Sequence, residues 1–173
     1  MKYFSPNALL NQEVIINLFD IFEQENLEIC LVGGCVRDAL LGIQSKDFDV
    51  AANIEPKKII SVLKKYNIQF DDYALKYGSV IAYIKNYKFQ ITALREDINQ
   101  RGRHTNIIYT DNWEKDAKRR DFTINAIYIS SNGEIKDYFN GKKHLVENRL
   151  EFIGDIEERV KEDYLRIARY YRF

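Results

Sequence analysis

The sequence has few of the residues that build disulfide frameworks, and it lacks long apolar runs. Its two cysteines, Cys30 and Cys35, have four residues between them and no further metal-ligand partners nearby. They are therefore interpreted as reduced structural residues of an intracellular protein. No apolar stretch approaches the length of a membrane span, and Met1 and Lys2 lead into an amphipathic pattern instead of a signal sequence. These absences predict a cytoplasmic protein with no membrane partner.

The sequence also lacks an excess of either charge. It contains 26 Lys and Arg residues and 26 Asp and Glu residues, for a formal net charge of zero. A strongly basic chain would by itself indicate nucleic-acid binding, so here any RNA contact has to come from a local patch. The length of 173 residues fits one domain, or one domain with the beginning of another, and is enough to bury a core.

The stretch from Leu31 to Ala51 carries the clearest chemical signal. Its pattern predicts a buried strand, a glycine turn, a short helix and a second strand that contains Asp47 and Asp49. Side chains at i and i+2 of a strand face the same way, so the two carboxylates can converge on one point. Hard carboxylate oxygens suit Mg²⁺, which takes its remaining ligands from water and substrate phosphates. The pair is thus a candidate metal site.

The glycine turn before the short helix suits a phosphate group. Gly33 and Gly34 stand where strand becomes helix, and their backbone N–H groups favour an anionic triphosphate. Arg37 adds a forked cationic donor three residues later, and Asp38 is placed to orient that arginine or to cap its helix. Together with the aspartate pair, this turn predicts metal and phosphate chemistry.

At these residues the chain resembles a known family, the class II CCA-adding enzymes and bacterial poly(A) polymerases of the DNA polymerase beta superfamily. The resemblance covers nearly the whole chain. It runs through these segments in order: Gly33–Asp38, Asp47–Asp49, Gln90–Arg95, Arg119–Ala126, Asp137–Gly141 and Glu162–Arg166. It implies a nucleotidyltransferase head followed by a helical neck, and in the resembling enzymes body and tail domains then hold the tRNA acceptor stem.

The resemblance also implies roles for residues whose charge alone does not indicate a function. Arg119 and Arg120 are implied to hold the triphosphate, and Asp121 and Asn125 the sugar region. Further along, Arg169 and Arg172 are implied to support the nucleotide. These roles rest on the match to the family motifs.

A base-recognition role is implied for Asp163 and Arg166. If this segment is helical, the two residues share a face and present an acceptor beside a donor. Cytosine and adenine each show an exocyclic amine beside an acceptor ring nitrogen, whereas uracil and guanine reverse that order. A carboxylate and a guanidinium locked together would therefore select CTP and ATP, because the wrong base leaves buried polar groups unpaired.

The chain departs from the family pattern at two positions. Gln90 stands where the motif often has a glutamate, on a strand where relatives place a third carboxylate. An amide ligates without adding charge, so Asp47 and Asp49 are interpreted as sufficient with water and phosphate. The polar segment 95–106 predicts a mobile loop, which in the resembling enzymes helps to switch from adding C to adding A. Within it, Arg101 occupies a position where an acidic residue is expected.

The predicted fold class is α+β, with a small mixed sheet of about five strands and helices packed on one side. The expected domains are an N-terminal helix over 1–26, the catalytic head over 27–150 and the start of a helical neck over 151–173. Apolar and turn patterns predict these elements: a helix from Ser5, strands over 27–32, 48–52, 78–84, 87–94, 122–129 and 134–138, helices over 36–41, 56–66, 112–120 and 142–147, and one helix over 155–173.

The predicted reaction is transfer of a nucleoside monophosphate from CTP or ATP to a tRNA 3′ end, with Mg²⁺ at Asp47 and Asp49. The first alternative is a poly(A) polymerase, which shares these motifs. The second is a head fragment that binds nucleotide without turnover, or that docks onto a separately encoded body and tail subunit. A homo-oligomer also stays open, because an exposed apolar neck face favours self-association.

Overall fold

A seven-stranded mixed sheet forms the centre of the protein. The computed structural model describes residues 7–101 and 104–173, with side chains described outside 99–105. The strand order is β3-β4-β5-β2-β1-β8-β9, and β2 pairs in parallel with β5 while the other neighbours are antiparallel. The sheet has more strands than the five expected. Its strands are β1 (Ile29–Val32), β2 (Asp47–Ala52), β3 (Gln69–Asp71), β4 (Ser79–Ile84), β5 (Tyr87–Ala93), β8 (Ile127–Ile129) and β9 (Ile135–Asp137).

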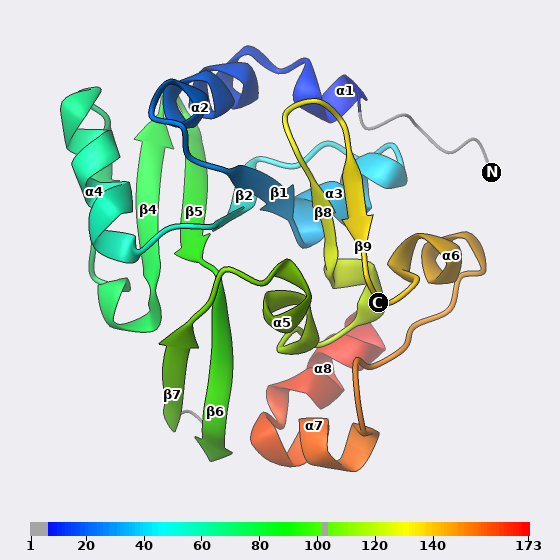
Figure 1. Cartoon of the computed structure of the whole chain (residues 1–173). Coiled ribbons are helices and arrows are strands. Elements are labelled where there is room, and N and C mark those ends of the chain that lie inside the picture. The colour runs from blue at the N-terminus through cyan, green and yellow to red at the C-terminus, as the bar shows by residue number, and fades with distance from the viewer. Residues whose placement is uncertain (1–6, 102–103) are drawn as a thin grey trace.

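The larger core lies between one face of this sheet and the helices of the first third of the chain (Figure 1). These helices are α1 (Asn7–Leu10), α2 (Glu13–Gln24), α3 (Gly34–Leu40) and α4 (Pro56–Lys65). The alternate residues Phe48 and Val50 of β2 point into this core, where Phe48 stacks on Phe89 with ring centroids 5.0 Å apart. Burial of one face of β2 leaves its other residues, Asp47 and Asp49, on the opposite side.

A smaller core covers part of that opposite face. The helix α5 (Trp113–Lys118) packs there, and the ring of Trp113 meets that of Tyr128 edge-on at 5.6 Å. Ala51 belongs to this cluster and is buried, whereas Asp47 and Asp49, four and two residues before it, are exposed. The prediction of helices on one side of the sheet is therefore wrong, because α5 packs on the second face. The two carboxylates lie just outside the part of this face that α5 covers.

The segment expected to be a mobile loop forms a two-stranded hairpin instead. The strands β6 (Arg95–Arg101) and β7 (His104–Tyr109) pair antiparallel and extend away from the main sheet (Figure 1). Apolar alternation is absent from this segment because a two-stranded hairpin buries little on either face. The residues 102–103 at its turn, and the side chain of Arg101, lie outside the described part of the structure.

The C-terminal segment is two helices, not the one helix predicted over 155–173. The helix α7 (Ile156–Glu162) ends at Asp163, whose backbone is extended at φ −152° and ψ 102°, and α8 (Leu165–Arg172) follows. The carboxylate of Asp163 accepts a hydrogen bond from the backbone N–H of Leu165 at 3.0 Å. Such a local bond competes with helix continuation, which explains the break that apolar periodicity could not predict.

Short elements complete the chain. These are η1 (Leu75–Tyr77), η2 (Thr123–Asn125) and α6 (Gly141–Val146). A Cβ at Gly141 would lie 2.2 Å from the carbonyl oxygen of Thr123, so only glycine allows α6 to pack this closely on η2. None of the helices in the described ranges is long and apolar enough to cross a bilayer.

Candidate active site

The carboxylates of Asp47 and Asp49 lie at the exposed start of β2, beside the glycine turn. Gly33 precedes α3 with φ at +78°, a conformation that favours glycine, and a Cβ there would lie 3.2 Å from Oδ2 of Asp49. The turn therefore brings backbone close to the carboxylate pair. On the other side of β2, the strand register places Lys88 next to Asp47 and Gln90 next to Asp49.

The aspartate pair has the properties of a cation site. Neither carboxylate has a hydrogen-bond or ion-pair partner within residues 7–101 and 104–173. Desolvation by the surrounding protein raises the pKa of Asp49, Arg120 opposes this rise, and Asp47 adds to it. No cluster of three or more acidic, histidine or cysteine ligands occurs in the described ranges, and the residue beside Asp49 on β5 is the neutral Gln90. Two unpaired hard oxygen donors on one face fit a Mg²⁺ ion that takes its other ligands from water and phosphate.

A cavity of about 480 Å³ opens beside Asp49. All of the site residues predicted from the sequence line it except Asp38 and Asp47. Its lining is strongly polar and consists of Gly33, Gly34, Arg37, Asp49, Arg95, Asp97, Arg119, Arg120, Asp121, Asn125, Asp163, Arg166, Arg169, Arg172 and Phe173. This set brings residues from both ends of the chain to a single concave surface.

The arginine pair is held by a carboxylate that the sequence reasoning missed. Asp116 is 1% exposed, and its Oδ1 lies 2.8 Å from Nη2 of Arg119 while its Oδ2 lies 3.1 Å from Nη2 of Arg120. The hydroxyl of Tyr128 donates to the same carboxylate at 2.7 Å and accepts from Nε of Arg120 at 3.0 Å. Burial alone would raise the pKa of Asp116, but the two guanidinium groups and the hydroxyl outweigh it and lower the pKa to about 2.

This buried anchor fixes both arginines in orientation. The bonds to Asp116 and Tyr128 use Nε and Nη2 of each guanidinium, and Nη1 of Arg119 and Arg120 has no partner in the described structure. The spacing i, i+3 and i, i+4 from Asp116 was a usable signal for these ion pairs. The part played by Tyr128 had no such signal, because it comes from a separate strand.

A chain of hydrogen bonds joins α3 to η2. Asp38 accepts from Nε and Nη2 of Arg37 at 2.9 and 2.6 Å, so it orients the arginine as predicted, while Ser45 donates to its other oxygen at 3.2 Å. Nη1 of Arg37 donates to Asn125 at 2.7 Å, and Asn125 in turn donates to Asp121 at 3.1 Å. The sugar-region pair inferred from the family motif is thus connected to the glycine turn.

The two C-terminal helices are attached to the arginine pair by Arg159, which the sequence reasoning also missed. Its Nη2 donates to the backbone carbonyls of Arg119 and Arg120 at 2.6 and 2.5 Å, at the end of α5. Glu162 accepts from Nη1 of both Arg159 and Arg166 at 2.6 Å. The clamp formed by Arg159, Glu162 and Arg166 therefore holds α7, α8 and α5 in fixed relation.

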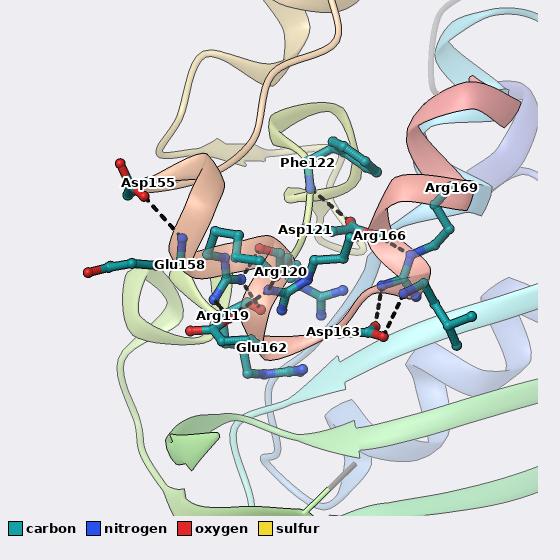
Figure 2. Close-up of polar contacts among 12 residues, drawn as sticks. Arg119, Arg120, Asp121, Phe122, Asp155, Glu158, Glu162, Asp163, Arg166 and Arg169 are labelled. Carbon is teal, nitrogen blue, oxygen red and sulfur yellow. Dashed lines mark hydrogen bonds and ion pairs between the residues drawn. The ribbon is translucent and has the colours of Figure 1, made fainter. Parts of the chain in front are cut away.

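Asp163 and Arg166 are not locked to each other as the sequence reasoning expected. Arg166 is 4% exposed and pairs with Glu162, whereas the carboxylate of Asp163 pairs with Nη2 of Arg169 at 2.8 Å (Figure 2). The helix break after Glu162 explains the difference, because it turns Asp163 away from the position that a continuous helix would give it. Both residues still line the cavity.

The remaining predicted arginines lie at the same end of the cavity. Nε of Arg169 lies 3.1 Å from Oδ2 of Asp121, which connects α8 to η2. The guanidinium of Arg172 lies 5.0 Å from the ring centroid of Phe173, and that of Arg37 lies 4.5 Å from it on the α3 side. These contacts place the ring of Phe173 beside two guanidinium groups at this end of the cavity.

The fold with this site is that of a nucleotidyltransferase head. A crystal structure of the Bacillus stearothermophilus CCA-adding enzyme in complex with CTP matches 93% of this chain and 38% of its own, with a TM-score of 0.81 and 29% identity. A tRNA nucleotidyltransferase complexed with a primer tRNA and an incoming ATP analog matches 90% of this chain and 44% of its own, with a TM-score of 0.74 and 26% identity.

The chain belongs to the Poly A polymerase head domain family, whose model matches residues 29–151. It is 38% identical over its whole length to human CCA tRNA nucleotidyltransferase 1, mitochondrial, and 33% identical over 98% of its length to poly(A) polymerase I of Haemophilus influenzae. The chain spans about 40% of the length of these relatives. The match confirms the family inferred from the motifs of the sequence.

Proposed function

We propose that this protein transfers a nucleoside monophosphate from CTP or ATP to the 3′ end of a tRNA and releases pyrophosphate. The observation that carries the proposal is one cavity that joins the unpaired carboxylate of Asp49 to the anchored arginines Arg119 and Arg120. Such a cavity offers a cation site beside an anion site, which nucleotidyl transfer requires. The CCA-adding relatives support CCA addition as the particular reaction.

Asp47 and Asp49 would hold Mg²⁺. When bound, the ion lowers the pKa of an attacking hydroxyl and neutralises charge on the phosphate that is attacked. Arg119 and Arg120 would bind the β- and γ-phosphates through Nη1, which their bonds to Asp116 leave available. Because these guanidinium groups are already oriented, they stabilise the charge on the leaving pyrophosphate without reorganising.

The rest of the nucleotide would lie along the wall formed by η2 and α8. Asp121 and Asn125 would contact the sugar, with Arg37 holding Asn125 in place at 2.7 Å. Asp163 and Arg166 would recognise the base, and Arg169 and Arg172 would support it from the same helix. The base therefore lies next to Glu162, which fixes Arg166 by an ion pair at 2.6 Å.

The decisive experiment is incorporation of each labelled nucleotide by purified protein with Mg²⁺ into a tRNA that lacks its 3′ CCA. We expect C, C and A to be added from CTP and ATP, and Asp49→Asn to lower the rate by at least about 10²-fold. Because desolvation raises the pKa of Asp49, its ionised form destabilises the fold, so Asp49→Asn should unfold at the same or a higher temperature. That control separates a catalytic loss from misfolding.

Other outcomes would replace this proposal. Tails of A alone would favour a poly(A) polymerase, the activity named for the Haemophilus influenzae relative. Binding of CTP without incorporation would indicate a head that needs segments or a partner beyond this chain, which spans about 40% of its relatives.

We also propose a cytoplasmic location, supported by the free and buried state of Cys30 and Cys35.

A further inference from the structure

The geometry of the site gives the attacking RNA one direction of approach. Gly33 and Nη1 of Arg120 lie on the β1 side of Asp49, where a Cβ built on Gly33 would be 3.2 Å from the carboxylate and 3.9 Å from that nitrogen. The proposed leaving pyrophosphate therefore lies on this side. In an in-line displacement the attacking and leaving oxygens stand on opposite sides of the phosphorus. The RNA hydroxyl then arrives from the β5 side.

The β5 side of the carboxylate pair carries exposed side chains at the end of the sheet where Asp47 and Asp49 lie. The register places Lys88 and Gln90 directly beside Asp47 and Asp49, and Tyr83 of β4 directly beside Lys88, so the side chains of all five point to the same face. Lys88, Gln90 and Tyr83 are exposed. The helix α4 packs on the other face of these strands, through the core that contains Phe89 and Ile91.

We propose that this face, formed by Tyr83, Lys88 and Gln90 and called here the β4–β5 face, binds the terminal nucleotides of the RNA primer. The ammonium of Lys88 has no hydrogen-bond or ion-pair partner in the described ranges, and it acts on Asp49 electrostatically by lowering its pKa. It contacts a phosphate of the primer. Tyr83 lies two strands from Asp47, about 10 Å across the sheet, and stacks on a base.

Charge explains why an RNA strand suits this face. The carboxylates repel a polyanion, and Lys88 is the cation that the strand pairing sets immediately beside them. A phosphate held at Lys88 brings the terminal hydroxyl toward Asp47 and Asp49 without requiring a net positive protein. Gln90 offers an uncharged amide that donates to, and accepts from, the terminal ribose hydroxyls. This inference rests on the proposed function and assigns the RNA-binding side of that same site.

The first test compares Lys88→Gln with Lys64→Gln, a matched loss of charge on the exposed surface of α4, behind the sheet. Lys88→Gln should raise the KM for a CCA-less tRNA about tenfold and leave the KM for CTP within about twofold. The slope of log primer affinity against log salt should become shallower by about 0.7, as expected for one lost phosphate contact on a single strand. Lys88→Arg should restore most of the affinity, and Lys64→Gln should change neither constant.

A second test locates the RNA directly. A tRNA primer with 4-thiouridine at its penultimate position should crosslink to a peptide that contains Tyr83 or Lys88, and Tyr83→Leu should reduce that crosslink at least about fivefold. Equal primer KM values in Lys88→Gln and Lys64→Gln would overturn the inference. So would a rise in the KM for CTP alone, because Lys88 would then serve the nucleotide.

The outcomes also separate this inference from the proposed function. If the parent protein adds no nucleotide, the function fails, and the β4–β5 face is tested by fluorescence anisotropy of a labelled single-stranded RNA. Weaker binding and a shallower salt slope in Lys88→Gln alone support the face as an RNA site. Identical binding by the parent protein, Lys88→Gln and Lys64→Gln would contradict it.

Discussion

At the scale of single residues, the site depends on one buried carboxylate. Asp116 holds Arg119, Arg120 and Tyr128, and the two guanidinium groups keep it ionised although it is almost fully buried. A buried charge without a counter-ion destabilises the fold. Asp116 and the two guanidinium groups therefore each lower the free-energy cost of burying the others. Asp116 is thus a structural residue whose effect reaches the proposed phosphate site.

We predict that Asp116→Asn lowers the free energy of unfolding at pH 7 by about 2–4 kcal/mol, because two half-buried arginines lose their counter-ion. The pKa of Asp116 is about 2 in the folded protein and has an ordinary value of 3.8. Its contribution is therefore fully present above about pH 4 and is lost as the pH falls toward 2. The measurement is urea unfolding of the parent and the variant across this range.

The exposed Asp20 on α2 supplies the control for this prediction. Asp20→Asn should change the unfolding free energy by less than about 0.5 kcal/mol both at pH 7 and at pH 2.5. A difference between the parent protein and Asp116→Asn that stays constant from pH 7 to pH 2.5 would contradict the assigned electrostatic role.

At the scale of elements, the clamp formed by Arg159, Glu162 and Arg166 couples α7 and α8 to the end of α5. Arg159 satisfies the carbonyls of Arg119 and Arg120, which follow the last turn of α5 and would otherwise need another donor. The same clamp fixes the buried side chain of Arg166 in the cavity wall. The residues proposed for base recognition and for phosphate binding are therefore joined through this clamp.

We predict that Glu162→Gln raises the KM for CTP about tenfold and reduces the preference for CTP over UTP, because Arg166 loses the ion pair that orients it. Steady-state kinetics with CTP and UTP measure both effects. Glu157→Gln, on an 83% exposed residue of the same helix, is the matched control and should behave as the parent. Unchanged discrimination in Glu162→Gln would show that Arg166 needs no support from this carboxylate.

At the scale of the whole molecule, the reactivity of the two cysteine thiols measures global unfolding. Cys30 and Cys35 are 0% and 3% exposed, and burial raises the pKa of each thiol to about 12. The thiolate is the reactive species, so native protein at pH 8 should resist a disulfide reagent. We expect no labelled thiol in the folded protein and two in urea, measured by absorbance of the released thiolate.

Nucleotide binding provides the control for this measurement. The proposed function has CTP bind the folded state. Saturating CTP should then slow further any labelling of a thiol that requires global unfolding. Rapid labelling of one thiol in native protein, unaffected by CTP, would contradict the burial of that cysteine.

Sequence patterns were enough to predict the family, the fold class and most residues of the candidate site. Alternation in β2 and the glycine turn predicted adjacent carboxylates and phosphate donors because strand geometry and positive φ are local properties. The glycine turn predicted a role for Arg37, and the family motifs implied roles for Asp121 and Asn125. The local sequence also predicted that Asp38 could orient Arg37, because the two residues are neighbours in the chain.

The pairing of the charged groups, in contrast, depends on the folded arrangement of the chain. Arg37 reaches Asn125 across 88 residues, and Arg159 reaches Arg119 across 40. The break after Glu162 assigned Arg166 to that glutamate and Asp163 to Arg169. Periodicity specifies the faces of helices and strands, but many carboxylates and guanidinium groups are compatible with each face. The folded chain selects among them by distance and burial, which depend on how separate segments pack.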